Sequence, residues 1–253
     1  MRTLAVIPAR LGASRLPRKP LRALGGAPLI VRVWQRVTAM GVAERVVVAA
    51  DHDDVAAAVR DAGGECVLTD PAHPSGTDRV AEVARDPRFA HFGTIVNVQG
   101  DEPFVNEAAV RGAAALVASG RFPLGTAAAR AGPEILDSRN IVKVVRADDG
   151  RALYFSRAAI PWLRDESDRS LRNALVLQHV GIYAYSRDAL AAWVALPPHP
   201  LELVERLEQL RPLAAGQAMG VALVDEVPSG GVDTEDDLLR ANRRWDDLFA
   251  GRT

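Results

Sequence analysis

Short apolar runs alternate with helical patterns through the first half of the chain, and this alternation restricts the fold more than any other feature. The runs cover residues 3–7, 45–50, 65–68 and 94–98. They are almost continuously apolar, which is typical of strands buried on both faces. Strands that alternate with helices form parallel sheets covered by helices on both sides. The sequence therefore predicts an α/β fold with a mainly parallel sheet.

Helix signals separate these expected strands. Pro28 is typical of a first helical position, and apolar residues recur at helical spacing from Leu29 until Gly41 ends the helix. We expect Asp51 to cap the next helix, which ends at Gly63. These two helices complete the strand–helix–strand alternation.

The second half of the chain is richer in antiparallel signals. Two β-type runs within residues 140–156 flank Asp149-Gly150, which predicts a hairpin turn. The other expected elements are a strand over 175–185, a helix over about 201–214, a strand over 220–227 and a last helix that starts at Thr234 with Asp237 in a capping box.

Size and composition are compatible with a single domain. The chain has 253 residues and is 48% hydrophobic, which is enough for one large core. Neither a linker nor a repeat interrupts it. We therefore expect one domain over residues 1–253, with a β-rich extension around 140–185 that could mediate dimerisation.

The overall charge argues against several classes of function. The chain has 31 lysines and arginines against 32 aspartates and glutamates, so its net charge is −1. We therefore expect no nucleic-acid or membrane partner, and any anion site must be local. Cys66 is the only cysteine, which excludes an internal disulfide. The first apolar run ends at Pro8 and Arg10, so we expect no signal peptide and a cytoplasmic protein.

A basic loop, ARLGASRLPRKP over residues 9–20, follows the first expected strand. Ligands of parallel α/β sheets bind beyond the carboxyl ends of strands, where this loop begins. Its small residues let backbone N–H groups approach an anion, and guanidinium groups match phosphate oxygens. The loop therefore predicts a polyphosphate site, with an ordinary solvated loop as the alternative. It is neither a Walker P-loop nor a GxGxxG motif.

Two acidic residues are candidates for a metal site. Asp101 follows the fourth expected strand in the stretch Gln-Gly-Asp-Glu-Pro, where a carboxylate could hold Mg²⁺. A simple turn explains that stretch equally well. Asp233 precedes the last expected helix, and an acidic residue there could merely complement the helix dipole. Spacing alone cannot bring the two residues together.

Seven motifs in order resemble one enzyme family. They are VIPARLGASRLPRKPL, HPSGTDR, VNVQGDEP, ALYFSRAAIPW, HVGIYAY, LELVERLEQLR and VPSGGVDTEDDL, and together they span about residues 3–240. They closely resemble the 3-deoxy-manno-octulosonate (Kdo) cytidylyltransferases, or CMP-Kdo synthetases. The resemblance implies a nucleotide-diphospho-sugar transferase (glycosyltransferase-A-like) fold and a homodimer. It also implies the Mg²⁺-dependent conversion of CTP and Kdo to CMP-Kdo and pyrophosphate, which feeds lipopolysaccharide or a related glycoconjugate.

The resemblance also implies roles for residues on the nucleotide side. It places Asp101 and Asp233 at the metal and, with Lys19, makes them the catalytic residues. The expected nucleotide-binding residues are Arg10, Ser14, Arg15, Lys19, Ser75, Arg79 and Gln99. Arg18 stands at a loop position that is often glycine in this family.

The acceptor side follows from the same motifs. Arg157 suits a bidentate contact with the Kdo carboxylate. His179 and Tyr183 are four apart on an expected strand, so we expect them on one face. The expected substrate-binding residues are Gln99, Arg157, His179, Tyr183, and a stripe of one helix formed by Glu202, Glu205 and Gln209.

Three alternatives stay open at this point. The acceptor could be another ulosonic acid, such as a sialic acid or amino-Kdo. A metal-dependent glycosyltransferase shares the core fold, but Gly-Asp-Glu-Pro stands where such enzymes normally carry Asp-x-Asp. A non-catalytic protein would bind CTP without releasing pyrophosphate.

Overall fold

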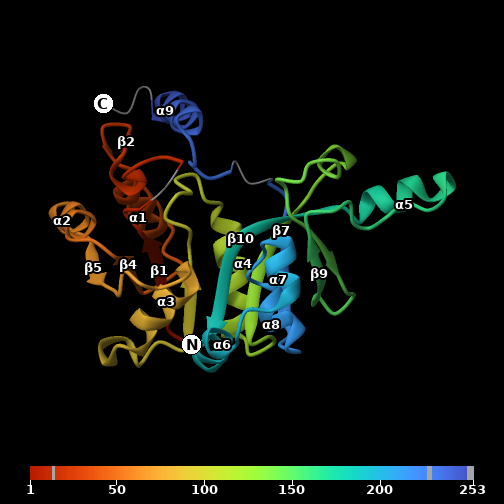
Figure 1. The fold of residues 1–253 in the computed structure, drawn as a ribbon, viewed down its shortest axis with the longest axis horizontal. Helices are drawn as coiled ribbons and strands as arrows, with labels where there is room; N and C mark the ends of the chain where they lie inside the picture. The colour runs from red at the N-terminus through yellow and green to blue at the C-terminus, as the bar shows by residue number, and fades with distance from the viewer. Residues whose placement is uncertain (13–14, 227–229, 250–253) are drawn as a thin grey trace. The chain divides into compact units, whose positions relative to one another are not determined.

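A computed structural model describes residues 1–12, 15–226 and 230–249, with only the backbone described at residue 249. The chain clusters into two compact units (Figure 1). The N-terminal unit comprises the described residues within Arg2–Phe92, Asn97–Val105 and Ser229–Thr253. The central unit comprises Met1 and the described residues within Gly93–Val96 and Asn106–Pro228.

Three parallel strands form the sheet of the N-terminal unit. They are β1 (Thr3–Ala9), β4 (Arg45–Ala50) and β5 (Glu65–Leu68), in the order β1-β4-β5, with Val6 opposite Val47. Both valines are fully buried, as their continuously apolar runs predict. The predicted strands over 45–50 and 65–68 are confirmed, and the first strand is longer than predicted.

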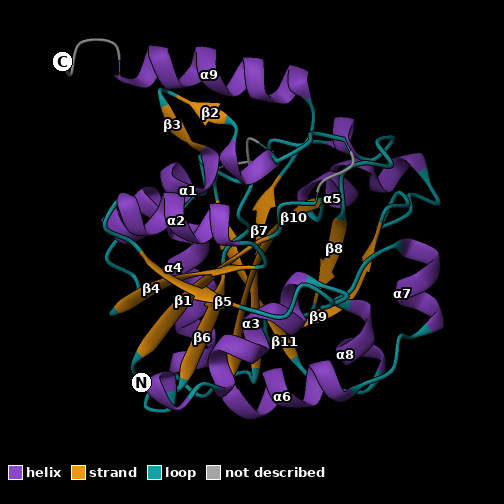
Figure 2. Cartoon of the chain, turned by 60° about the vertical axis from the view of Figure 1, so that its left-hand side comes forward, coloured by secondary structure: helices purple, strands orange, loops and turns teal. Residues whose placement is uncertain are grey.

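Helices lie on both sides of this sheet. Figure 2 shows α1 (Leu29–Ala39) and α2 (Asp53–Asp61) on one side and α3 (Gly76–Arg85) on the other. Pro28 is the N-cap of α1, one residue before its expected place. The other elements near this sheet are η1 (Lys19–Leu21), β2 (Ala23–Leu24), β3 (Ala27–Pro28) and η2 (Pro87–Phe89).

The last helix, α9 (Glu235–Phe249), also belongs to the N-terminal unit. Thr234 Oγ1 accepts from the Asp237 N–H, and the Asp237 carboxylate accepts from the Thr234 N–H, which confirms the predicted capping box. Asn242 ties α9 to the β2–β3 hairpin, because its amide group bonds to the backbone of Ala23 and Gly25.

The central unit has a mixed sheet. Its main strands are β6 (Thr94–Asn97, whose last residue belongs to the N-terminal unit), β7 (Leu124–Arg130), β10 (Leu177–Ser186) and β11 (Met219–Val224), in the order β11-β7-β10-β6. Strand β11 pairs in parallel with β7, whereas β10 is antiparallel to β7. Its other elements are α4 (Glu107–Ala118), η3 (Pro133–Ile135), η4 (Glu166–Asp168), α5 (Arg169–Ala174), α6 (Arg187–Ala195), α7 (Pro200–Glu205) and α8 (Leu210–Ala214).

The sequence pattern does not predict β7, because its run of small residues has little strand propensity. Small residues are needed there for close packing: a Cβ on Gly125 would lie 2.4 Å from the carbonyl oxygen of Ala113 in α4. By contrast, the predicted hairpin is confirmed as β8 (Lys143–Arg146) and β9 (Ala152–Ser156), with Gly150 at a φ of +93° in its turn.

The prediction of one helix over 201–214 is wrong. The chain forms α7 and α8 instead, and Arg206 between them adopts a left-handed φ of +56°. Pro212 explains the break: it has no N–H for an uninterrupted helix but is tolerated in the first turn of a new one. Glu202, Glu205 and Gln209 therefore do not form one helical stripe. Within the described residues, no helix combines the length and apolar character needed to cross a membrane.

Candidate active site

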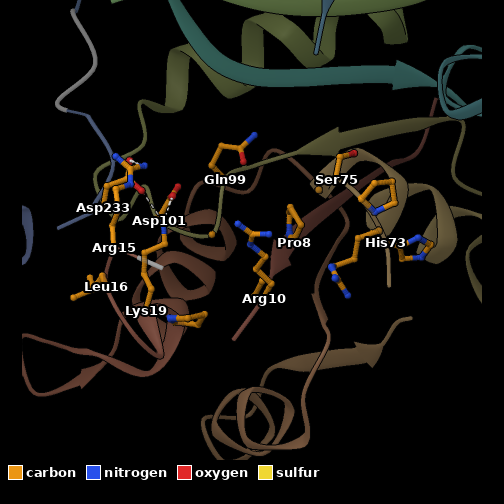
Figure 3. A pocket seen from close by; sticks show the side chains of 16 residues that line it. Pro8, Arg10, Arg15, Leu16, Lys19, His73, Ser75, Gln99, Asp101 and Asp233 are labelled. Carbon is orange, nitrogen blue, oxygen red and sulfur yellow. Dashed lines mark hydrogen bonds and ion pairs between the residues drawn. The ribbon is translucent and has the colours of Figure 1, made fainter. Parts of the chain in front are cut away.

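A pocket of about 570 Å³ opens at the carboxyl end of β1, entirely within the N-terminal unit (Figure 3). This volume lies in the usual range for small-ligand sites. Its walls come from residues 8–10, 15–16, 19–20, 73–76, 79, 99–101 and 233. The basic loop and both candidate metal carboxylates thus line the same cavity.

One lysine joins the two candidate carboxylates. Lys19 Nζ lies 2.5 Å from Asp101 Oδ2 and 2.9 Å from Asp233 Oδ1. Arg15 Nη2 lies 3.0 Å from the other oxygen of Asp233. Figure 3 shows these four side chains together at one end of the pocket. The Asp233 segment is held there because the N–H of Val232 donates to the carbonyl oxygen of Asp101 at 2.8 Å.

The charge of Lys19 is stabilised by this cluster. Burial alone lowers its pKa, but the charge of Asp101 and the hydrogen bonds to Asp101 and Asp233 outweigh that effect. The net result is a raised pKa, so Lys19 is a permanent cation at neutral pH.

The same two carboxylates suit a hard divalent cation. Mg²⁺ takes one or two carboxylates and completes its shell with water and phosphate oxygens. Asp101 and Asp233 converge on a single cation, the Lys19 ammonium, so their charges are already directed at one place. The described residues hold no group of three or more His, Cys, Asp or Glu side chains that could bind a metal. The convergence of Asp101 and Asp233 fits a two-carboxylate site whose shell is completed by water and phosphate oxygens.

Gly100 allows the segment carrying Asp101 to approach β1. A Cβ at this position would lie 2.6 Å from the carbonyl oxygen of Pro8, closer than packed atoms come. The half-buried Gln99 next to it also lines the pocket. The predicted residues Gln99 and Asp101 are thus brought to the basic loop by a close backbone contact.

Other predicted nucleotide-binding residues lie further along the pocket. Arg10 lines it and is exposed, and within the described residues it has no hydrogen-bond or ion-pair partner. Ser75 lines it too, while its hydroxyl caps α3 through Asp78. Ser14 lies outside the described residues. Arg18 points elsewhere, since its guanidinium binds Asp54 at 2.6 Å.

Asp51 supports the pocket through its contacts with neighbouring residues. Its predicted role as a helix cap is wrong. His52 caps α2 instead, its Nδ1 accepting from the Asp54 N–H at 3.1 Å. Asp51 Oδ1 accepts from the N–H of Leu11 in the basic loop at 2.8 Å, and Oδ2 lies 3.8 Å from Nη2 of the buried Arg79. Asp51 thus links the basic loop to a predicted nucleotide-binding arginine.

Replacing Asp51 with asparagine tests this link. The amide oxygen can still accept from Leu11, but the charge facing Arg79 is lost, so we expect KM for CTP to rise about fivefold, roughly 1 kcal/mol. Steady-state kinetics at saturating acceptor measures this. The matched control is Asp54→Asn, which removes an exposed carboxylate paired with Arg18. Equal KM values for the two variants would contradict the link.

His73 also lines the pocket, although no role was predicted for it. Its Nε2 lies 2.5 Å from Glu82 Oε2, which also accepts from the N–H of Asp70. The signal that could have found it is its place directly before the Pro-Ser-Gly-Thr motif.

Apart from Gln99, the predicted acceptor residues belong to the central unit, and two of them are directly bonded. The Arg157 N–H donates to Glu205 Oε2 at 2.9 Å, and Arg157 Nε donates to the Glu205 carbonyl oxygen at 2.9 Å. Ser156 Oγ donates to Glu205 Oε1 at 2.6 Å. Glu205 therefore fixes the end of β9 against the end of α7.

Glu202 and Gln209 differ in how their polar atoms are satisfied. Both oxygens of Glu202 bind Arg211, whose hydrogen bonds hold the pKa of this carboxyl below its usual range. Gln209 is 3% exposed, and within the described residues its Nε2 has no hydrogen-bond partner. Gln209 thus has a buried donor without a partner among the described residues, whereas Glu202 is engaged in the α7–α8 connection. Both acceptor roles stay predictions.

His179 lies in the core of the central unit. Its ring packs edge-on against Phe155 at 4.9 Å, and its Nε2 lies 2.9 Å from Thr126 Oγ1. The Thr126 hydroxyl donates to the carbonyl oxygen of Ile182 at 2.7 Å, so it accepts from Nε2–H of a neutral ring. The Tyr183 ring lies 5.6 Å away, and the register of β10 against β7 shifts between Val180 and Tyr183. Their contacts with an acceptor stay predictions.

Burial lowers the pKa of His179 from 6.5 to about 3, which makes stability depend on pH. In the unfolded chain this histidine is protonated below about pH 6.5, whereas in the folded chain the buried ring stays neutral. The free energy of unfolding is therefore highest above pH 6.5 and falls as the pH is lowered. We expect a loss of about 1.4 kcal/mol per pH unit below about pH 6. Urea unfolding from pH 5 to 7 should show this slope reduced in His179→Gln but kept in His91→Gln, a change at an exposed histidine. Equal slopes would contradict it.

Comparison with known proteins identifies the family. The model of a cytidylyltransferase family matches residues 4–219. The 3-deoxy-manno-octulosonate cytidylyltransferase of Gemmatimonas aurantiaca is 60% identical over 253 residues, covering 100% of this chain and 98% of that protein. The protein of the same name from Herminiimonas arsenicoxydans is 47% identical, covering 94% of this chain and 96% of that protein.

Solved structures agree with the fold prediction. A structure of CMP:2-keto-3-deoxy-manno-octonic acid synthetase complexed with CTP matches with a TM-score of 0.89 and 35% identity, covering all of both chains. A 4-diphosphocytidyl-2C-methyl-D-erythritol synthase from Anaerococcus prevotii matches with a TM-score of 0.61 over 96% of this chain and 97% of that one. At 14% identity it shares the fold alone, and the two structures together confirm the predicted α/β nucleotidyltransferase architecture. This chain belongs to the cytidylyltransferase family, and within it to the 3-deoxy-manno-octulosonate cytidylyltransferases.

Proposed function

We propose that this chain transfers the cytidylyl group of CTP to Kdo, which yields CMP-Kdo and pyrophosphate. The observation that carries the proposal is the convergence of Lys19, Asp101 and Asp233 in one pocket at the carboxyl end of β1. Such a pocket suits a nucleoside triphosphate, because cations for the phosphates and carboxylates for a metal lie side by side. The curated relatives carry the name of this activity.

The basic loop is the proposed phosphate site. Arg10, with no partner within the described residues, is ready to bind phosphate oxygens, and Arg15 and Lys19 can move from Asp233 to them. Ser14 belongs to the same proposed site. Gln99, Ser75 and Arg79 are the proposed contacts to the rest of the nucleotide.

Asp101 and Asp233 are the proposed ligands of Mg²⁺. When bound, this ion would supply positive charge to the phosphate oxygens and to the attacking hydroxyl. Lys19 stabilises the charge that builds up on the leaving pyrophosphate. Transfer of this kind depends on positioning and charge neutralisation more than on covalent chemistry, so we assign no protein side chain as general base.

Gln99 is a proposed contact of the acceptor as well as of the nucleotide, and the other proposed acceptor contacts come from the central unit. Arg157 would bind the Kdo carboxylate, and Gln209, Tyr183 and His179 would bind or position its hydroxyl groups. Glu205 and Glu202 act through their bonds to Arg157 and Arg211.

Several further properties are proposed with this function. We expect a cytoplasmic, single-domain protein that forms a homodimer through the region around 140–185. Its product would serve lipopolysaccharide or a related glycoconjugate. None of its partners is a nucleic acid or a membrane.

An acceptor panel tests the proposal. Purified protein with CTP and Mg²⁺ is given Kdo, amino-Kdo or N-acetylneuraminic acid, and the products are identified by mass spectrometry. CMP-Kdo as the preferred product supports the proposal. If a CMP conjugate of another acid is preferred, the acceptor is that acid and not Kdo. If no acid gives a conjugate, the proposed activity is rejected.

A further inference from the structure

Lys143 on β8 is a fully buried lysine, with a side chain at 0% exposure. Its Nζ donates to three backbone carbonyl oxygens, those of Ser138 at 2.8 Å, Ile141 at 2.7 Å and Arg157 at 2.6 Å. Within the described residues no carboxylate lies within ion-pair distance of it. The hydrogen bonds of the cation are therefore made to backbone carbonyls, while the more distant carboxylates of Glu205 and Asp137 act on it only through their charge.

Three carbonyls match the three N–H donors of a charged ammonium, whereas a neutral amine would present a lone pair to one of them. Removing an ammonium from water is costly, and an apolar residue of similar volume usually stabilises a core at least as well. Burial also lowers the pKa of Lys143. Stability alone does not explain a lysine here.

The carbonyls held by Lys143 belong to the segment that surrounds Arg157. The segment 138–141 presents four carbonyl groups in a row: those of Ser138 and Ile141 accept from Lys143. Those of Arg139 and Asn140 accept from Arg157 Nη1 at 3.2 and 3.4 Å. Lys143 thus shapes the wall against which the Arg157 guanidinium lies, and it also holds the backbone of Arg157.

The remaining bonds of Arg157 leave one edge of its guanidinium available. Its Nε is bonded to Glu205 and its Nη1 to the segment 138–141. Within the described residues Nη2 makes no hydrogen bond. The direction of that edge is fixed by Glu205 on one side and by the Lys143-bound segment on the other.

We propose that Lys143 is a positioning residue that aims the free edge of Arg157 at the carboxylate of the acceptor sugar acid. The inference rests on the proposed function, in which Arg157 binds that carboxylate. Lys143 itself does not touch substrate. It organises the backbone of residues 138–141 and 157. Its loss should therefore weaken binding of the acceptor more than binding of the nucleotide.

The test compares Lys143→Met with Val144→Ala in steady-state kinetics. Methionine keeps the length of the side chain but removes the charge and the donors. Val144 is equally buried, and as the next residue on β8 it faces the other way, so its truncation controls for a general loss of core packing. We expect KM for Kdo to rise at least about tenfold in Lys143→Met, because a misplaced contact group loses much of its effect. KM for CTP should stay within about twofold in both variants.

A rise in both KM values, or the same KM for Kdo in both variants, would overturn the inference. Wild-type protein is assayed alongside: if it fails to use Kdo, the proposed function fails, independently of Lys143. If Lys143→Met does not fold, the inference is tested on the wild-type protein instead, by recording the NMR signals of its lysine ¹⁵Nζ groups. With CTP bound and Mg²⁺ chelated, added Kdo should shift the Lys143 ammonium signal, and an unchanged signal would overturn the inference.

Discussion

Replacing Asp101 with asparagine is expected to lower kcat about a hundred- to a thousandfold and to raise the Mg²⁺ concentration needed for half-maximal activity. The variant removes one of two carboxylates that converge in the pocket, and with it the closest counter-charge of Lys19, at 2.5 Å. Losses of this size are typical when one preorganised electrostatic contact is removed from a site of this kind. Pyrophosphate release as a function of Mg²⁺ concentration measures both effects.

Glu235→Gln is the matched control for Asp101→Asn. Glu235 is a carboxylate two residues after Asp233 in the sequence. It is exposed and pairs with Arg22 instead of lining the pocket. Its loss should leave kcat and the Mg²⁺ requirement unchanged. Full Mg²⁺-dependent turnover by Asp101→Asn would show that the metal role of Asp101 is wrong.

Replacing Lys19 with methionine is expected to lower kcat by a similar factor, about a hundredfold or more, for a different reason. Lys19 carries a permanent charge that would stabilise the leaving pyrophosphate, and methionine supplies none. Removing its ammonium also leaves Asp101 and Asp233 without their shared cation. Their mutual repulsion favours a metal ion between them.

The two variants therefore differ in their response to Mg²⁺. The half-saturating concentration should rise in Asp101→Asn but stay level or fall in Lys19→Met. A parallel rise in both variants would contradict the distinct roles of the lysine and the carboxylate.

The strands of the N-terminal unit could be predicted because their signal is local. Continuous apolar runs such as 45–50 need no tertiary information, and the structure places that strand at the predicted bounds. Strand β7 was missed because its small residues are chosen for close packing against α4, a long-range requirement. The prediction of one helix over 201–214 fails because Pro212 cannot lie inside an uninterrupted helix, and the chain forms α7 and α8 instead.

In the candidate site, too, features with a local sequence signal could be predicted and features that depend on long-range contacts could not. The basic loop was predicted from charge and small residues, but nothing in the spacing could bring Asp233 to Asp101. That contact depends on the backbone bond between Val232 and Asp101. Asp51 was misassigned because an acidic residue before a helix predicts a cap, whereas here its carboxylate turns inward to Leu11.

Arg18 illustrates how structure explains a departure from the family pattern. Its φ of +54° lies in the left-handed region, which glycine adopts without strain. Arginine is tolerated at this position while its guanidinium binds Asp54 outside the pocket. The extra charge of the loop is thus directed away from the proposed phosphate site.

The most direct test of the whole account is pyrophosphate release by the purified wild-type protein, with each component omitted in turn. We predict rapid release with CTP, Kdo and Mg²⁺ together, one pyrophosphate for each Kdo consumed, and almost none when any of the three is left out. Tight CTP binding without release under the complete conditions would contradict the account, because it would leave the pocket as a nucleotide-binding site without cytidylyl transfer.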